Sequence, residues 1–416
     1  MRLLASRFLR WSSIALLALS SLIAIGEPVM WSLPELEKIP GMQPAPEVDP
    51  GDGLRAFYYA GLPLNGKPTR VFAIYGAPAN ASSEHKVPGI VLVHGGGGTA
   101  FAAWVKLWRD RGYAAIAMDN TGGLPIGKTG AWQRVQGGGP GFQGVVQVNL
   151  SVTDQWMYHA VADTVLAHSL LRSFPEVDAD RTGITGISWG GVITCTAAGI
   201  DPRFKFAVPV YGCGFLSDPP GSGLANDGSC FVGENADPAL RARWRELWDP
   251  ANYLSRVRVP VLWVVGSNDF AFTLGAVRQS IETVPGGAML SVHPRMIHSH
   301  GGPGEKPEEI HAFADRMVNG GPPLIRITDQ GESPDGNVWV EYDSTGSSEP
   351  REAVLWTTHN QGLWQNRWWS DHPAKIDPVH HRVTARLPAG AACWYLSITD
   401  SRGLITSSIW HERATR

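Results

Sequence analysis

The pattern of hydrophobic and polar positions divides the chain into two parts. From about residue 54 to residue 321, short apolar runs rich in β-branched residues alternate with longer helical stretches. Several of the runs are almost continuously apolar, as in parallel strands that are buried on both faces. The expected strands are Val71–Tyr75, Gly89–His94, Ala114–Asp119, Thr182–Ile187, Phe206–Val210, Val259–Val265 and Met289–His293. The expected helices are Phe101–Arg111, Asp154–Arg172, Trp189–Ala198, Leu274–Glu282 and Pro307–Val318.

This alternation predicts an α/β domain over residues 54–321, built on a doubly wound, mostly parallel sheet. The character of the chain changes after Pro322 and Pro323, where long helical periods end. Short alternating runs separated by turn residues then predict a small all-β, sandwich-like module over residues 322–416. The expected strands of this module are Asn337–Tyr342, Ala353–Thr357, His381–Leu387 and Cys393–Thr399.

The N-terminus has the features of an export signal. Arg2, Arg7 and Arg10 precede an uncharged, mostly apolar run from Ile14 to Ile25, and small residues follow where a signal peptidase would cut. We therefore expect residues 1–26 to be a signal peptide, with a membrane anchor as the alternative, and residues 27–53 to be an N-terminal extension. The expected location is secreted or periplasmic.

Charge and cysteine content restrict the classes of partner. The chain has 35 basic and 38 acidic residues, so nothing in its net charge indicates a nucleic-acid partner. Four cysteines show no zinc-type spacing, and we expect no metal and no organic cofactor. Export would permit a disulfide between Cys213 and Cys230, 17 positions apart, but two unpaired thiols are an equal alternative.

The strongest chemical signal is a G-x-S-x-G motif centred on Ser188. An apolar strand leads into Gly186, and a helix of small and apolar residues begins after Ser188. This context is that of a nucleophile elbow, in which a Cβ at Gly186 or Gly190 would collide with the neighbouring backbone. The helix N-terminus also favours the negative charge that develops during attack. Ser188 is therefore predicted to be the catalytic nucleophile.

A glycine run, His94–Gly98, follows the second expected strand. Backbone N–H groups in such a run can approach the oxyanion of an acyl-transfer reaction. We predict an oxyanion hole formed by the N–H groups of Trp189 and of Gly96 or Gly97. The alternative of a phosphate-binding loop is disfavoured because no Gly-Lys-Ser/Thr sequence follows. His94 itself is expected to be structural.

The expected acid and base follow later strands. Asp269 comes directly after the run that ends in Gly266, where a carboxylate can orient an imidazole and stabilise its positive charge. Two histidines, His298 and His300, follow the last expected strand. The catalytic base is assigned to His298, with His300 left open, and a metal site at this pair is disfavoured because no further ligands cluster there.

These residues resemble the α/β-hydrolase superfamily over residues 54–320. Gly186–Gly191, the sequence Asp201–Phe204 and Asp269 are similar to the corresponding motifs of dienelactone-hydrolase-like and acetylxylan-esterase-like enzymes, with prolyl-oligopeptidase-type peptidases as neighbours. The resemblance implies hydrolysis of carboxylic esters, including deacetylation of a plant polysaccharide. The chain departs from compact dienelactone hydrolases, which use a cysteine nucleophile and carry no C-terminal module.

The tryptophans bear on the substrate. Trp132 and Trp156 bracket most of the long segment 122–156, which is expected to contribute to the rim of the site, although packing is favoured for Trp156. Seven of the 17 tryptophans lie in the C-terminal module. They are Trp339, Trp356, Trp364, Trp368, Trp369, Trp394 and Trp410. Such residues either form the sandwich core or stack on sugar rings, and the set most expected to be exposed is Trp364, Trp368 and Trp369.

The function hypothesis is two-step acyl transfer from a small-molecule or carbohydrate ester, with Ser188, His298 and Asp269 in these roles. A secreted peptidase acting on short peptides is the alternative enzyme. A binding protein on a hydrolase scaffold is a third class, disfavoured because all three residue types occur in the chain order expected for the fold.

Overall fold

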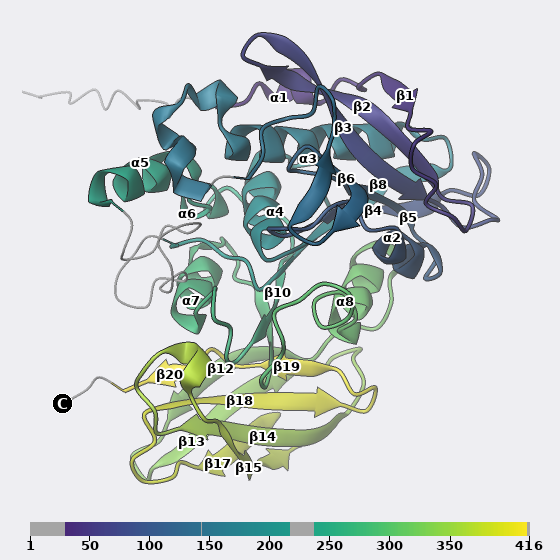
Figure 1. Ribbon diagram of the computed structural model, residues 1–416. Coiled ribbons are helices and arrows are strands. Elements are labelled where there is room, and N and C mark those ends of the chain that lie inside the picture. Colours follow the sequence, from purple (N-terminus) through teal and green to yellow (C-terminus); the bar gives the residue numbers. More distant parts are fainter. Residues whose placement is uncertain (1–29, 143, 217–236, 414–416) are drawn as a thin grey trace, which may run out of the picture. The chain divides into compact units, whose positions relative to one another are not determined.

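The structure is a computed structural model that describes residues 30–142, 144–216 and 237–413. A nine-stranded sheet runs through its first part, in the order β1-β2-β3-β5-β4-β8-β9-β10-β11 (Figure 1). The bounds are β1 Met42–Pro44, β2 Arg55–Leu64, β3 Lys67–Gly76, β4 Val87–Val93, β5 Ala114–Met118, β8 Val177–Ile187, β9 Ala207–Val210, β10 Leu262–Gly266 and β11 Met289–His293.

The sheet is mixed, with a parallel part and an antiparallel edge. Strands β5, β4, β8, β9, β10 and β11 pair in parallel, and all six were expected from their apolar runs. The edge strands β1, β2 and β3 pair antiparallel, and β3 joins β5. Strands β1 and β2 were not expected, because their exposed positions interrupt the apolar pattern.

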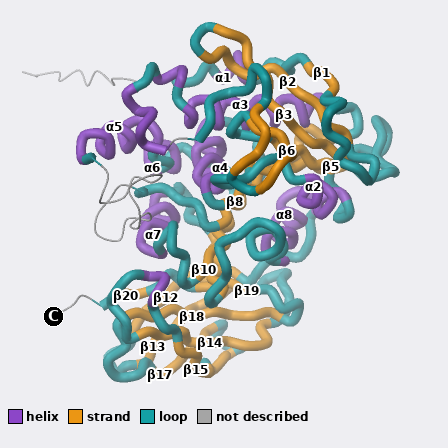
Figure 2. The backbone as a smooth tube through the Cα atoms, in the orientation of Figure 1, coloured by secondary structure: helices purple, strands orange, loops and turns teal. Residues whose placement is uncertain are grey.

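The helices cover the sheet (Figure 2). They are α1 Leu33–Leu36, α2 Ala102–Arg109, α3 Trp156–Ser173, α4 Trp189–Ile200, α5 Pro238–Trp248, α6 Ala251–Leu254, α7 Leu274–Thr283 and α8 Glu308–Asn319. Helices α2, α3, α4, α7 and α8 match expected helices to within a few residues. Helix α5 was not expected; Asp237 caps it by accepting from the N–H of Ala239 at 2.8 Å.

The C-terminal part, after residue 325, consists of two antiparallel sheets. One has the order β12-β13-β17-β16, and the other has β15-β14-β18-β19, with β20 paired to β18. The bounds are β12 Arg326–Glu332, β13 Asn337–Asp343, β14 Pro350–Thr358, β15 Ser370–Pro373, β16 Lys375–Asp377, β17 Arg382–Arg386, β18 Cys393–Asp400, β19 Ile405–Ser407 and β20 His411–Glu412. Val338, Leu355, Val383 and Leu396 from both sheets belong to one buried cluster.

Hydrogen bonds join these sheets to the α/β part. The N–H of Val292 in β11 donates to Ser407 Oγ at 3.0 Å, and the N–H of Ile405 donates to the buried Glu309 Oε1 at 2.7 Å. Residues 33–416 accordingly form one compact unit.

Within the described residues, no helix is long and apolar enough to cross a membrane. The expected signal peptide, residues 1–26, lies outside the described part of the chain.

A buried histidine stabilises the packing behind β8. His168 of α3 is fully buried; its Nδ1 lies 2.7 Å from Asp201 Oδ2 and its Nε2 lies 2.8 Å from Thr182 Oγ1. The ring stacks on Phe204, with centroids 3.8 Å apart. Burial lowers the pKa of His168 to about 4, against the partial compensation from Asp201.

This shift predicts acid sensitivity of the fold. His168 of the unfolded chain takes up a proton near pH 6.5, whereas the folded chain resists protonation until about pH 4. The free energy of unfolding should therefore fall as the pH drops through this window, by roughly 3 kcal/mol from this residue. Urea denaturation of His168→Gln should show a shallower pH dependence, while His85→Gln in an exposed loop should keep the wild-type slope. Equal slopes in all three proteins would refute this role.

Candidate active site

Ser188 lies on a strained turn between β8 and α4. Its backbone has φ 60° and ψ −121°, a region that a residue with a side chain enters only at a cost of about 1–3 kcal/mol. The N–H of Ser188 donates to Val210 O at 2.9 Å, and its carbonyl accepts from Val192. The turn presents a partly exposed serine at the carboxyl end of a buried strand, as the motif predicts for a nucleophile elbow.

The glycines of the motif are required by contacts with neighbouring backbone. A Cβ at Gly190 would lie 1.9 Å from the carbonyl oxygen of Val93, and one at Gly186 would lie 2.2 Å from the carbonyl oxygen of Gly190. A Cβ at Gly191 would lie 2.9 Å from the backbone of Gly212. Strand β4, the elbow and the end of β9 therefore meet at a spacing that only glycine permits.

Asp269 and His298 are brought together across 29 positions of sequence. His298 Nδ1 lies 2.7 Å from Asp269 Oδ2, and the other carboxylate oxygen, Oδ1, accepts from the N–H groups of Ala271 and Phe272, each at 2.8 Å. Asp269 is buried, at 3% exposure. These bonds fix the carboxylate, which in turn orients the imidazole so that Nε2 points away from the acid.

His300 has a different environment. Its Nε2 accepts from the N–H of Gly95 at 3.0 Å, and its Nδ1 lies 3.4 Å from Glu305 Oε1. Burial lowers the pKa of His300, with Glu305 acting in the opposite direction. A neutral ring suits a nitrogen that accepts an N–H bond. The structure therefore places His298 against the acid and His300 against the glycine loop.

The glycine loop lies beside Ser188. A Cβ at Gly95 would lie 2.8 Å from Ser188 Cβ. The N–H of Gly98 donates to Gly95 O, while the N–H groups of Gly96 and Gly97 have no partner within the described chain. Trp189 is the first residue of α4, so its N–H lies at the positive end of the helix. Gly96 also lines the cavity that contains Ser188, whereas Gly97 and Trp189 are not among its lining residues.

His94 is a structural residue of this loop. It is buried at 1% exposure, its Nδ1 lies 2.8 Å from Gly95 O, and its Nε2 accepts from the N–H of Asn120 at 3.1 Å. The side-chain amide of Asn120 donates in return to His94 O at 2.9 Å. These bonds fix the start of the glycine loop to the end of β5.

Ser188 and His298 line one cavity of about 440 Å³. The glycine loop, Phe101, Thr129 and the segment His298–Gly301 complete its wall. Ser188 Oγ and His298 make no direct hydrogen bond to each other in the described structure, a bond that often tightens only when substrate binds. Within the described residues, no group of three or more His, Cys, Asp or Glu residues could hold a metal ion.

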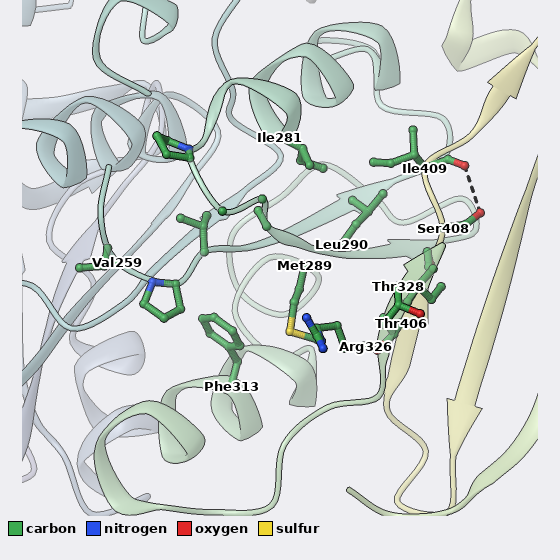
Figure 3. A pocket seen from close by; sticks show the side chains of 18 of the residues that line it. Val259, Ile281, Met289, Leu290, Phe313, Arg326, Thr328, Thr406, Ser408 and Ile409 are labelled. Atoms are coloured by element: carbon green, nitrogen blue, oxygen red, sulfur yellow. Dashed lines mark hydrogen bonds between the residues drawn. The ribbon is translucent and has the colours of Figure 1, made fainter. Parts of the chain in front are cut away.

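A second cavity, of about 610 Å³, lies elsewhere (Figure 3). Val259 and Met289, at the amino ends of β10 and β11, line it together with Thr406 and Ile409 of the C-terminal part. Ser188 is not among its lining residues, and ligands of open α/β sheets bind at the carboxyl ends of the strands. This cavity is therefore not the candidate active site.

The Gly-rich segment after residue 122 reaches the cavity, as expected. Strands β6 Gly123–Lys128 and β7 Ala131–Arg134 form a hairpin, whose turn residue Thr129 lines the cavity. Trp132 donates its indole N–H to Gly97 O at 2.8 Å, so it supports the glycine loop. Trp156 is buried and packs against Phe142 and Trp189, which is the packing role favoured for it.

The prediction for the C-terminal tryptophans was wrong for two of three. Trp364 and Trp369 are buried, at 6% and 3% exposure, and their rings stack with centroids 6.3 Å apart. Trp368 is exposed at 66%. A polar loop does not imply exposed tryptophans, because the loop folds back on the two rings and leaves one outside.

Cys213 is a buried free thiol in the structure, and Cys230, its candidate disulfide partner, lies outside the described residues.

Tyr211 is a site residue that sequence reasoning missed. Its ring stacks on the imidazole of His298, with centroids 4.5 Å apart and planes at 21°. Its hydroxyl donates to Ile297 O at 2.9 Å, which fixes the loop that carries His298. Its position directly after the expected strand Phe206–Val210 was the available signal, since the ends of parallel strands converge at such sites.

Comparisons with known proteins fit this geometry. A family model for acetyl xylan esterase matches residues 56–220, and a model for the prolyl oligopeptidase family matches residues 146–312. Both matches include Ser188; the first adds the glycine loop, and the second adds Asp269 and His298.

A curated relative and a solved structure are similar to this chain. Acylamino-acid-releasing enzyme from Rattus norvegicus is 26% identical over 263 residues, which cover 58% of this chain; the chain spans 32% of that relative's length. The acetyl xylan esterase from Paenibacillus sp. R4 superposes with a TM-score of 0.51 at 21% identity, covering 69% of this chain and 92% of that chain. The protein therefore has the α/β-hydrolase fold. Its sequence is similar to two families of serine hydrolases.

The close approach at the elbow predicts a strong stability effect. Gly190→Ala would place a methyl group against the Val93 carbonyl, and we expect the free energy of unfolding to fall by about 2 kcal/mol or more. A matched variant, Gly41→Ala, meets nothing within 4 Å and should change stability by less than about 0.5 kcal/mol. Urea denaturation midpoints at constant slope measure both. Equal small effects would show that the elbow relaxes freely.

Proposed function

We propose that this protein is a serine esterase that cleaves carboxylic esters through an acyl-enzyme formed on Ser188. The observation that carries the proposal is the pairing of His298 with Asp269 at 2.7 Å in a loop that shares one cavity with Ser188. Matches to two serine hydrolase families that include Ser188 support it.

In the first step His298 Nε2 takes the proton of Ser188 Oγ as the oxygen attacks the ester carbonyl. The charge that develops on the carbonyl oxygen is held by the N–H groups of Gly96 and Gly97, which have no partner within the described chain, and by the N–H of Trp189 at the start of α4. His298 then gives its proton to the leaving alcohol. Asp269 stabilises the imidazolium while it exists.

In the second step a water molecule takes the place of the alcohol. His298 removes a proton from the water as the water oxygen attacks the acyl carbon; it then gives this proton to Ser188 Oγ as the bond between Oγ and the acyl carbon breaks, which releases the carboxylic acid and restores the Ser188 hydroxyl. Tyr211 acts as a positioning residue, because its stacked ring and its bond to Ile297 hold His298 in place.

The proposed substrate is an acetyl ester of a carbohydrate. A match to the acetyl xylan esterase family over residues 56–220 supports this choice. We further propose that residues 1–26 direct export, on the basis of their basic and apolar pattern, and that residues 322–416 form a sandwich-like module within the compact unit of residues 33–416.

A peptidase acting on short acylated peptides is the second candidate. It is favoured by the match of the prolyl oligopeptidase family to residues 146–312, which include all three proposed catalytic residues. A panel of acetyl esters and acylated peptide anilides discriminates the two functions, since the better substrate class has the higher kcat/KM.

Removal of the nucleophile tests the mechanism. Ser188→Ala should lower kcat on p-nitrophenyl acetate, and on any cleaved peptide anilide, at least about a thousandfold. It should also abolish labelling by a fluorophosphonate probe. Ser401→Ala, in an exposed turn of the C-terminal part, should retain both properties. Near-normal turnover by a folded Ser188→Ala protein would refute the assignment.

Substitutions of His298 and His300 should lower kcat to very different extents. His298→Ala removes the general base and should lower kcat on the order of a thousandfold. His300→Ala removes the acceptor of the Gly95 N–H and the long contact with Glu305 but no proton-transfer group, and the loss of such hydrogen bonding should cost about tenfold or less. Steady-state kinetics on p-nitrophenyl acetate measure both. The reverse order would assign the base to His300.

A further inference from the structure

A further hollow, different from the two cavities described above, adjoins the candidate active site at His298. It has a volume of about 430 Å³, and His298 lines both this hollow and the cavity of Ser188. One wall comes from the α/β part, with Phe270, Arg295 and Ile297. The other wall is the segment 365–368 of the C-terminal part, here named the tryptophan loop. Two parts of the chain thus build a depression that begins at the proposed catalytic base.

The tryptophan loop is fixed in position by Asn268, the neighbour of Asp269. The side-chain amide of Asn268 donates to Arg367 O at 2.6 Å and to Trp364 O at 3.1 Å. The guanidinium of Arg367 lies 3.6 Å from the ring centroid of the buried Trp364 and pairs with Glu412 at 2.8 Å. A loop held by a buried aromatic ring, an ion pair and an amide keeps its outward side chain in a defined place.

That outward side chain is Trp368. Its exposure is 66%, and the guanidinium of Arg295 lies 3.9 Å from the ring centroid. Phe270 and Ile297, which line the same hollow, are exposed at 47% and 69%. Grouped exposed apolar side chains on a folded protein indicate a binding surface.

Polar groups surround this apolar surface. Arg295 has no carboxylate partner within the described chain, and the side-chain amides of Gln365 and Asn366 have no hydrogen-bond partner there. An indole face bordered by a guanidinium and two free amides matches the chemistry of a sugar ring, which has flat C–H faces and hydroxyl groups at its edge. An acyl chain would leave these polar groups unpaired.

We infer that this hollow binds the carbohydrate alcohol portion of the ester, with a sugar ring stacked on Trp368. The inference rests on the proposed function. His298 must give its proton to the leaving oxygen, so the alcohol portion of a bound ester lies on the His298 side of Ser188. The hollow adjoins the Ser188 cavity at His298, which lines both, so the alcohol portion would extend into the hollow while the acyl group remains in the cavity by the glycine loop. The C-terminal part thereby selects the substrate.

The experiment compares a large and a small ester. Trp368→Ala should lower kcat/KM for an acetylated xylo-oligosaccharide at least tenfold more than for p-nitrophenyl acetate, mainly through KM, and Trp368→Phe should restore most of the loss. Trp339→Ala is the matched control: Trp339 also stacks under an arginine, Arg382 at 4.0 Å, but does not line the hollow. It should leave the ratio of the two substrates unchanged.

The outcomes separate this inference from the proposed function. If the wild-type protein does not hydrolyse p-nitrophenyl acetate, the proposed esterase function is refuted. Hydrolysis of that ester together with an unchanged substrate ratio in Trp368→Ala refutes only the sugar subsite. The sugar subsite is also refuted if the wild-type protein cleaves the small ester but no acetylated oligosaccharide. It is refuted as well if the protein prefers acylated peptides and Trp368→Ala lowers kcat/KM for those peptides instead.

Discussion

The close backbone contact at Gly190 is the constraint on which the site depends. The carbonyl oxygen of Val93, at the end of β4, would lie only 1.9 Å from a Cβ added at Gly190. This close approach requires a residue without a side chain at position 190, and it brings the end of β4 beside the strained elbow, where Ser188 has φ 60°. Because the glycine loop continues directly from β4, the same contact sets the position of the oxyanion donors.

The remaining groups are positioned by loops at the carboxyl ends of β9, β10 and β11. Each loop fixes its functional side chain through backbone groups: Asp269 accepts two N–H bonds, and Tyr211 donates to the carbonyl of Ile297. Preorganised partners of this kind cost little reorganisation during reaction. His300 lies at the opposite wall of the cavity, where its Nε2 accepts a hydrogen bond from the N–H of Gly95 in the glycine loop. The two neighbouring histidines therefore connect the two halves of one site.

The loop after β10 also links the site to the C-terminal part. Asp269 faces His298, while the adjacent Asn268 binds the tryptophan loop. One peptide bond joins Asn268 to Asp269, so a shift of the tryptophan loop would displace the residue next to the acid. Through Asn268, the segment that carries Trp368 is bonded to the residue next to the acid, and the proposed sugar subsite places the C-terminal part beside the substrate.

The sequence by itself determined the six parallel strands, the five helices that cover them, and the elbow at Ser188, because local periodicity and the glycine motif encode these features directly. It also placed a carboxylate and two histidines after the correct strands. It assigned the base to His298 but left His300 open, because the two lie two residues apart in a loop without periodic pattern; the long-range contacts with Asp269 and Gly95 separate them. The exposure of Trp368, in contrast to Trp364 and Trp369, likewise depended on how a loop packs against residues about 100 positions away. Such contacts are decided by tertiary packing, since no local propensity distinguishes Trp368 from Trp364 and Trp369.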